Sequence, residues 1–97
     1  MNIEKTMNGS TEVLKLEGWL DTMAAAELEN ALGNLDPGAE KLILDLTGLE
    51  YISSSGIRQF VAAYKQMKGE MVLTHVSPEI LDVLHMTGLD KRLHIES

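Results

Sequence analysis

Three consecutive serines and a glycine, Ser53-Ser54-Ser55-Gly56, are the residues of this sequence best suited to carry a chemical modification. They lie between a short apolar run, Lys41 to Leu46, and a stretch with helical spacing that begins near Ser54. The first N–H groups of a helix have no partner inside the helix, and the helix dipole favours negative charge beside them. Functional groups of α/β proteins commonly gather at such strand-to-helix turns. We therefore take this serine turn as the candidate functional site.

The residues of the serine turn alone leave two interpretations open. Serine is a preferred N-cap that contributes about 1 kcal/mol to a helix, and any one of the three could fill this role. Capping does not explain three serines in a row. A phosphoryl group would add a charge of about −1.5 to −2 to an acidic surface and could switch a protein interface off, and anion binding is a related possibility.

The charge and hydropathy of the chain exclude several classes of partner. Fifteen acidic against eight basic side chains give a net charge of −7, which repels a phosphate backbone and favours a neutral or basic protein surface. The longest apolar fragments, such as Leu42-Ile43-Leu44, are far shorter than the roughly 20 residues that cross a bilayer, and no signal-peptide pattern is present. We expect a cytoplasmic protein that binds neither nucleic acid nor membrane.

The sequence lacks the residue patterns of an enzyme or of a metal site. There is no G-x-S-x-G elbow and no P-loop, and no motif places a histidine to activate Ser54. His75, His85 and His94 are widely separated and form no ligand pair, so we expect neither a metal nor a cofactor. Asp45, at the end of an apolar strand, is expected to accept hydrogen bonds from a neighbouring turn rather than to act in catalysis.

The first half of the chain predicts two strands and a helix before the central strand. Residues Thr11 to Leu20 alternate between apolar and polar, and the turn Asn8-Gly9 predicts pairing with Asn2 to Met7. A helix is expected to begin at Thr22, capped by Asp21 or Thr22, and to end before Asp36-Pro37-Gly38. The run Lys41 to Leu46 predicts a buried strand, followed by a loop from Thr47 to Ser53.

The second half predicts the same alternation of helix and strand. The helix that begins near Ser54 has apolar residues at i, i+3, i+4 and i+7 and ends at Gly69. The remaining elements are a strand within Glu70 to Val76, a helix that starts at Ser77-Pro78-Glu79 and ends at Gly88, and a last strand from Arg92 to Glu96. The order β-β-α-β-α-β-α-β predicts an α/β fold with a mixed sheet, formed by residues 1–97 as a single domain.

The motifs of the chain resemble those of a known family over essentially the whole sequence. They are GWLD at Gly18 to Asp21, LILDLTGLEYISSSGIR at Leu42 to Arg58, GEMVL at Gly69 to Leu73, and MTGLDKRL at Met86 to Leu93. The sequence thereby resembles the STAS domains of anti-sigma factor antagonists. This resemblance implies a non-enzymatic regulatory module that docks on an ATP-binding anti-sigma factor and thereby displaces a sigma factor.

The resemblance also implies roles for particular residues. The family motif D-S-S-G corresponds to Ser53-Ser54-Ser55-Gly56, and its first serine, here Ser54, is phosphorylated by a partner that is both kinase and anti-sigma factor. Phosphorylation would prevent docking. Asp21 matches the acidic residue of the family pattern G-x-L-D and is expected near Ser54. We expect Asp21, Trp19 and Arg58 to contact the partner.

Two points stay open at this stage. Ser53 replaces the usual aspartate of the motif, so a constitutive scaffold or a ligand-sensing STAS domain without phosphorylation is the alternative function. Trp19 lies on the polar side of its strand, where it would either be exposed in an interface or pack beneath a loop or the N-terminal strand. A monomer is favoured, although the sequence does not fix the oligomeric state.

Overall fold

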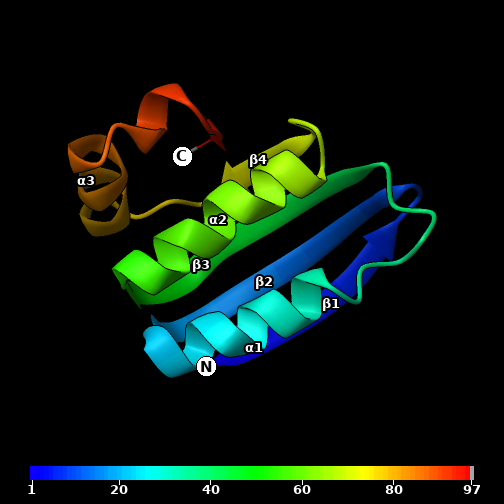
Figure 1. Ribbon diagram of the computed structural model, residues 1–97, viewed down its shortest axis with the longest axis horizontal. Helices are drawn as coiled ribbons and strands as arrows, with labels where there is room; N and C mark the ends of the chain where they lie inside the picture. The colour runs from blue at the N-terminus through cyan, green and yellow to red at the C-terminus, as the bar shows by residue number, and fades with distance from the viewer. Residues whose placement is uncertain (97) are drawn as a thin grey trace.

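The five strands of the sheet follow one another in space in the order of the sequence (Figure 1). The computed structural model describes residues 1–96. Only β1 and β2 are antiparallel, and β2 to β5 are parallel neighbours. The predicted α/β fold with its order β-β-α-β-α-β-α-β is confirmed. The elements are β1 (Asn2–Asn8), β2 (Thr11–Leu20), α1 (Thr22–Leu32), β3 (Lys41–Ile52), α2 (Ser54–Gln66), β4 (Met71–Thr74), α3 (Pro78–Met86), the short 3-10 helix η1 (Leu89–Lys91) and β5 (His94–Glu96).

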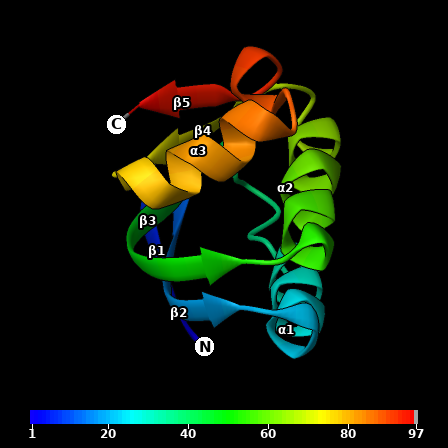
Figure 2. The same cartoon turned by 90° about the vertical axis from the view of Figure 1, so that its left-hand side faces the viewer.

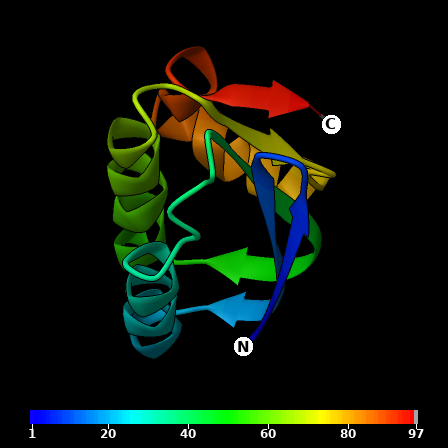
Figure 3. The same ribbon diagram turned by 90° about the vertical axis from the view of Figure 1, so that its right-hand side faces the viewer.

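The core lies between the sheet and the helices. Helices α1 and α2 lie side by side over one face of the sheet, and α3 stands beyond the end of β4 (Figures 1, 2 and 3). The alternating leucines of β2 and β3 point into this space, and each contributes about 1.5–3 kcal/mol by burial. The fully buried side chains include Leu14, Leu16, Leu20, Leu42, Leu44 and Leu46 of the sheet and Leu28, Phe60 and Leu84 of the helices.

The prediction of a loop from Thr47 to Ser53 is wrong, because β3 continues to Ile52. The second half of this strand pairs with the end of β2, in the register Gly18 with Leu49 and Leu20 with Ile52. Two register shifts in this pairing bend both strands, and Figure 2 shows their ends turned towards α1 and α2. The bend buries Leu49 and Ile52 against the core, although Thr47 and Gly48 resemble loop residues in the sequence.

Other elements are shorter than predicted. Helix α1 ends at Leu32, because Gly33 takes the C-cap position, and Gly33 and Asn34 form a turn. The predicted strand Glu70 to Val76 shrinks to β4, Met71–Thr74. The last strand begins at His94, not Arg92, because the N–H groups of Arg92 and Leu93 both donate to the Leu89 carbonyl, at 3.0 and 2.8 Å, and close η1.

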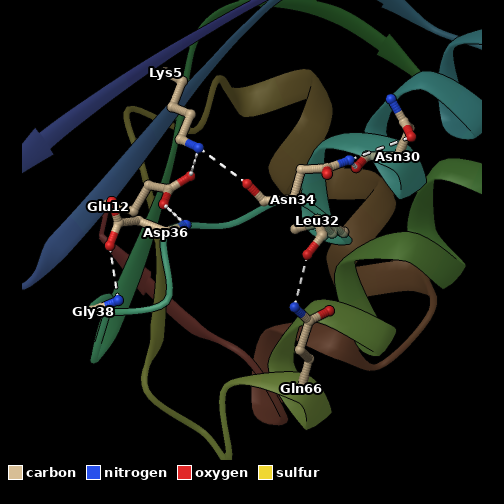
Figure 4. A network of polar contacts seen from close by, with 8 residues as sticks. All are labelled: Lys5, Glu12, Asn30, Leu32, Asn34, Asp36, Gly38 and Gln66. Atoms are coloured by element: carbon tan, nitrogen blue, oxygen red, sulfur yellow. Dashed lines mark hydrogen bonds and ion pairs between the residues drawn. The ribbon is translucent and has the colours of Figure 1, made fainter.

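The start of β2 carries a buried carboxylate that the sequence analysis did not single out. Glu12 is the one fully buried charged side chain in residues 1–96, and its Oε1 accepts a hydrogen bond from the Asp36 N–H at 2.6 Å (Figure 4). The Lys5 ammonium lies 3.7 Å from Oε2 and donates to the Asn34 carbonyl at 3.0 Å. These contacts fix the connection between α1 and β3 to the amino end of β2.

No helix in the described part of the chain is long and apolar enough to span a bilayer.

Candidate functional site

The serine turn lies where the carboxyl ends of β2 and β3 meet. Leu20 pairs with Ile52, and the Ser53 N–H donates to the Leu20 carbonyl at 2.8 Å. Asp21 and Ser53 are the next residues of the two strands, and each is the N-cap of the helix that follows. The structure therefore brings Asp21 and the serine turn together at one edge of the sheet, beside two helix N-termini.

The three serines of the turn have different environments. Ser53 is half-buried and extended, with φ −88° and ψ 169°, and its hydroxyl accepts the Gly56 N–H at 3.1 Å. The Ser55 hydroxyl accepts a weak hydrogen bond from Arg58 Nη2 at 3.4 Å. Ser54 is exposed, and its hydroxyl has no hydrogen-bond partner within residues 1–96. Capping thus belongs to Ser53, and Ser54 is the hydroxyl that is free to react.

Gly56 allows α2 to approach the end of β2 closely. A Cβ atom on this residue would lie 2.6 Å from Leu20 Cγ and 3.0 Å from Ile52 Cγ1, which is closer than side chains pack. The glycine is therefore required by packing rather than by an unusual backbone angle. Its role is to hold the serine turn against the paired ends of β2 and β3.

Asp21 and Arg58 place opposite charges near the serine turn. Asp21 is exposed, and its Oδ1 accepts the Ala24 N–H at 2.9 Å, which fixes the carboxylate at the start of α1. Arg58 is exposed and lies four residues after Ser54, so both residues occupy the same face of α2. The guanidinium is within reach of groups added to this face.

Trp19 is exposed and stacks on a second aromatic ring that the sequence analysis missed. Its register partner Tyr51 lies with its ring centroid 5.1 Å away at an interplanar angle of 32°. Trp19 is 60% exposed and Tyr51 is 43% exposed, so packing beneath a loop or β1 does not occur. Tyr51 was overlooked because it falls in the segment predicted as a loop. Recognition of the longer strand pairing would have placed the two rings side by side.

Asp45 is a structural hydrogen-bond acceptor at the middle of β3. Asp45 accepts hydrogen bonds from the Thr47 N–H and hydroxyl, as expected for a structural acceptor. Burial raises the pKa of this carboxyl, but the Thr47 hydrogen bonds together with the charges of His75 and Lys15 outweigh it, so the net pKa is below the ordinary value.

Each histidine lies beside an acidic residue of its own. His75, His85 and His94 have their nearest carboxylates at 3.2 Å (Asp45), 2.7 Å (Asp90) and 3.9 Å (Glu96), respectively. In the part of the chain that the structure describes, no three metal-ligating side chains converge, and no hydrogen bond joins a histidine to the serine turn.

Comparison with known proteins identifies the family. The STAS domain model matches residues 2–97. The chain belongs to the STAS domain family. It is 35% identical over 77 residues to a putative anti-sigma factor antagonist, BtrV, of Bordetella bronchiseptica, and the alignment covers 75% of this chain and 66% of that relative. The chain thus spans just under two thirds of the length of that relative.

Solved structures of the STAS family show the same fold. An anti-sigma factor antagonist from Mycobacterium paratuberculosis superimposes with a TM-score of 0.88 at 24% identity, over 98% of this chain and 84% of the other. The phosphorylated form of SpoIIAA from Bacillus gives 0.70 at 21% identity, over 99% and 92%. In keeping with the expectation of a non-enzymatic domain, the relatives that the chain resembles are named for antagonism of an anti-sigma factor, a regulatory role.

Proposed function

We propose that this STAS domain acts as an anti-sigma factor antagonist that docks on an ATP-binding anti-sigma factor with serine kinase activity. Phosphorylation of Ser54 by this partner ends the docking. The observation that carries the proposal is the free, exposed hydroxyl of Ser54, between one serine used as a cap and another held by Arg58. Support also comes from the STAS family match, the antagonist relative and the phosphorylated form of SpoIIAA.

The two neighbouring serines are poorer acceptors than Ser54. A phosphoryl group on Ser53 would remove the hydroxyl oxygen that caps α2 from its present geometry. Ser55 is half-buried and already bonded to Arg58. Ser54 is the first residue of α2, where the helix dipole stabilises a negative group by about 0.3–1 kcal/mol. Modification of Ser54 therefore leaves the fold intact and changes only the surface.

The switch operates through close contact. A docked partner must remove water from the exposed Ser54, and a phosphoryl group with a charge of about −1.5 to −2 resists this removal unless a cation pairs with it. Asp21 already supplies a carboxylate at the adjacent helix start, which opposes further negative charge. Arg58 lies on the same helix face and can pair with the phosphoryl group within the domain. We propose that the phosphoryl group on Ser54 is therefore tolerated while the turn faces solvent, and that it opposes docking when a partner covers the turn.

Ser53, where the family motif has aspartate, favours an alternative function. The serine hydroxyl caps α2 as a carboxylate would, so the shape of the turn is preserved while one charge is lost. A kinase that requires this charge would not act on Ser54. The domain would then be a constitutive scaffold or a ligand-sensing STAS domain. In either function we place the domain in the cytoplasm, as one unit of residues 1–97.

The proposal is tested by phosphate mapping on single-serine variants. The unmodified protein, Ser53→Ala, Ser54→Ala and Ser55→Ala are each incubated with candidate anti-sigma kinases and ATP, and the phosphorylated residue is mapped by mass spectrometry. We expect one phosphate, on Ser54, which disappears only in Ser54→Ala. Ser54→Asp should weaken binding to the same partner. Absence of phosphate together with unchanged partner binding of Ser54→Ala and Ser54→Asp would reject the switch and favour the scaffold.

A further inference from the structure

We infer that Trp19 and Tyr51 form a docking surface, here called the aromatic platform, for a basic, arginine-bearing segment of the partner. This inference rests on the proposed function in one respect, because it specifies the chemistry of the surface that the partner presents. The contact made by Trp19 and Tyr51 is separate from the contact made by Ser54. The platform lies at the carboxyl ends of β2 and β3, two residues before Asp21 and Ser53 respectively.

The aromatic platform is exposed, and its two rings contact each other. Leu20 and Ile52, the residues that follow the two rings in their strands, are buried in the core, so strand alternation directs Trp19 and Tyr51 outward. The rings contact each other at 5.1 Å between centroids, which restricts their motion. Large aromatic side chains with 60% and 43% exposure are unusual on a small protein and mark interaction sites. Little conformational entropy remains to be lost when a partner binds.

Carboxylates lie close to both rings in the sequence. Glu17 and Asp21 lie two residues before and after Trp19, and Glu50 precedes Tyr51; Asp21 and Glu50 are exposed. Two basic residues lie closest to the rings along the chain: Lys15, four residues before Trp19 on β2, and Arg58, seven residues after Tyr51 on α2. Four of the other basic residues lie at the opposite end of these strands: Lys5 beside Glu12, Lys41 at the start of β3, and Lys65 and Lys68 where α2 ends. The aromatic platform therefore combines two π-systems with negative charge.

This combination selects an arginine among the side chains that a partner can present. A guanidinium stacks on aromatic faces and pairs with carboxylates through several N–H donors at once, whereas a lysine ammonium offers one compact charge. An acidic segment is repelled by Glu17 and Asp21, which lie two residues before and after Trp19. A second copy of the chain carries the same net charge of −7, and an anionic membrane is repelled in the same way. Both the negative charge and the exposed rings of the platform therefore favour a basic protein segment as the occupant.

Trp19 itself reports the interaction, because it is the only tryptophan of the chain. Its fluorescence is followed while the full chain is titrated with a short peptide of alternating arginine and glycine. The lysine and glutamate versions of the peptide are titrated in parallel. We expect a saturable change with the arginine peptide, weaker binding of the lysine peptide and no binding of the glutamate peptide. Raising the salt to about 0.5 M should weaken the arginine complex.

Variants connect the fluorescence signal to the platform. Tyr51→Leu keeps an apolar side chain and should weaken the arginine peptide by about 5–30-fold, the range expected for the loss of one desolvated cation–π contact. Met86→Ala is the matched control, because Met86 is an exposed apolar residue at the end of α3, with 84% exposure. Equal binding of the arginine and glutamate peptides, or unchanged binding by Tyr51→Leu, would overturn the inference.

The peptide experiment uses neither kinase nor phosphate, so the inference and the proposed function can fail separately. Arginine-selective binding without any phosphate on Ser54 would support the platform and reject the phosphorylation switch. Phosphorylation of Ser54 together with partner affinity that is unchanged in Trp19→Leu, measured by calorimetry, would support the switch and reject the platform.

Discussion

The two ends of β2 use their polar residues in opposite ways. At the amino end, Glu12 is fully buried, accepts the Asp36 N–H and lies beside Lys5, so its charge is used within the fold. At the carboxyl end, Trp19 and Asp21 are exposed, and Ser54 follows on the neighbouring strand-to-helix turn. One strand therefore connects an end that fixes a loop to an end whose side chains are exposed.

The carboxyl end also separates structural from available groups. The Ser53 hydroxyl and one oxygen of Asp21 are used to begin the two helices, and Gly56 allows α2 to pack closely on β2. Ser54 remains free beside them. Ser54 can therefore stay without a hydrogen-bond partner, because Ser53 and Asp21 supply the caps of the two helices.

The largest effect is expected at the amino end. Glu12→Ala leaves the Asp36 N–H without its acceptor and should lower the free energy of unfolding by about 2–3 kcal/mol, measured by urea denaturation. Lys5→Ala should cost less than about 1 kcal/mol, since the Lys5 side chain is 47% exposed. A loss in Glu12→Ala no greater than in Lys5→Ala would contradict a structural role for this carboxylate.

Gly56→Ala should have the next largest effect, at the carboxyl end. The added Cβ would press on Leu20 Cγ at 2.6 Å, and such overpacking costs about 1–3 kcal/mol. Gly33→Ala is the matched control. Its Cβ would meet no atom closer than 3.5 Å, so the variant should be neutral or more stable by about 0.4–1 kcal/mol. Equal midpoint temperatures of thermal denaturation for the two variants would show that the packing of α2 on β2 does not require a glycine at position 56.

The serines of the turn should differ in their contribution to stability. Ser53→Ala removes the cap of α2 and should cost about 1 kcal/mol, whereas Ser53→Asp keeps an acceptor oxygen and should stay near the unmodified protein. Ser54→Ala changes an exposed side chain and should shift the free energy of unfolding by less than about 0.5 kcal/mol. A larger loss of unfolding free energy in Ser54→Ala than in Ser53→Ala would show that Ser54, and not Ser53, caps α2.

The smallest effect concerns the pair of the exposed His85 and the half-buried Asp90, which joins α3 to η1. The hydrogen bond and charge of Asp90 raise the pKa of His85 above 6.5, so this contribution is present below pH 6.5 and is lost as the pH rises through the raised pKa. The His85 hydrogen bond lowers the pKa of Asp90 below 3.8, so that contribution is present above pH 3.8 and is lost as the pH falls through the lowered pKa.

The pair should therefore stabilise the fold most between pH 3.8 and 6.5. The difference in urea midpoint between the unmodified protein and His85→Ala should be larger at about pH 5 than at about pH 8.5. An equal difference at both pH values would mean that the pair does not contribute through its charges.

Much of the fold could be predicted from the sequence because apolar periodicity and turn residues agree in most segments. The leucines at positions 14, 16 and 20 define the core face of β2, and Ser77-Pro78 defines the start of α3. The length of β3 could not be predicted in this way. Its second half alternates poorly because of two register shifts, and these depend on pairing with a strand that is distant in the sequence.

The candidate site was predicted in part. Its motif located the serine turn, but the separate environments of Ser53, Ser54 and Ser55 require coordinates, since identical side chains carry no distinguishing pattern. Tyr51 was missed together with the end of β3. The buried Glu12 had a usable signal, because it lies in phase with Leu14 and Leu16 on the core face of β2. A charged residue on that face indicates a partner contributed by another segment.

We propose that Ser54 controls docking at the carboxyl ends of β2 and β3. The most direct measurement compares, by calorimetry, the affinity of the cognate anti-sigma partner for the unmodified protein and for the protein phosphorylated stoichiometrically on Ser54. We predict at least about tenfold weaker binding after phosphorylation, equivalent to about 1.4 kcal/mol. Equal affinity of the two forms would contradict the account.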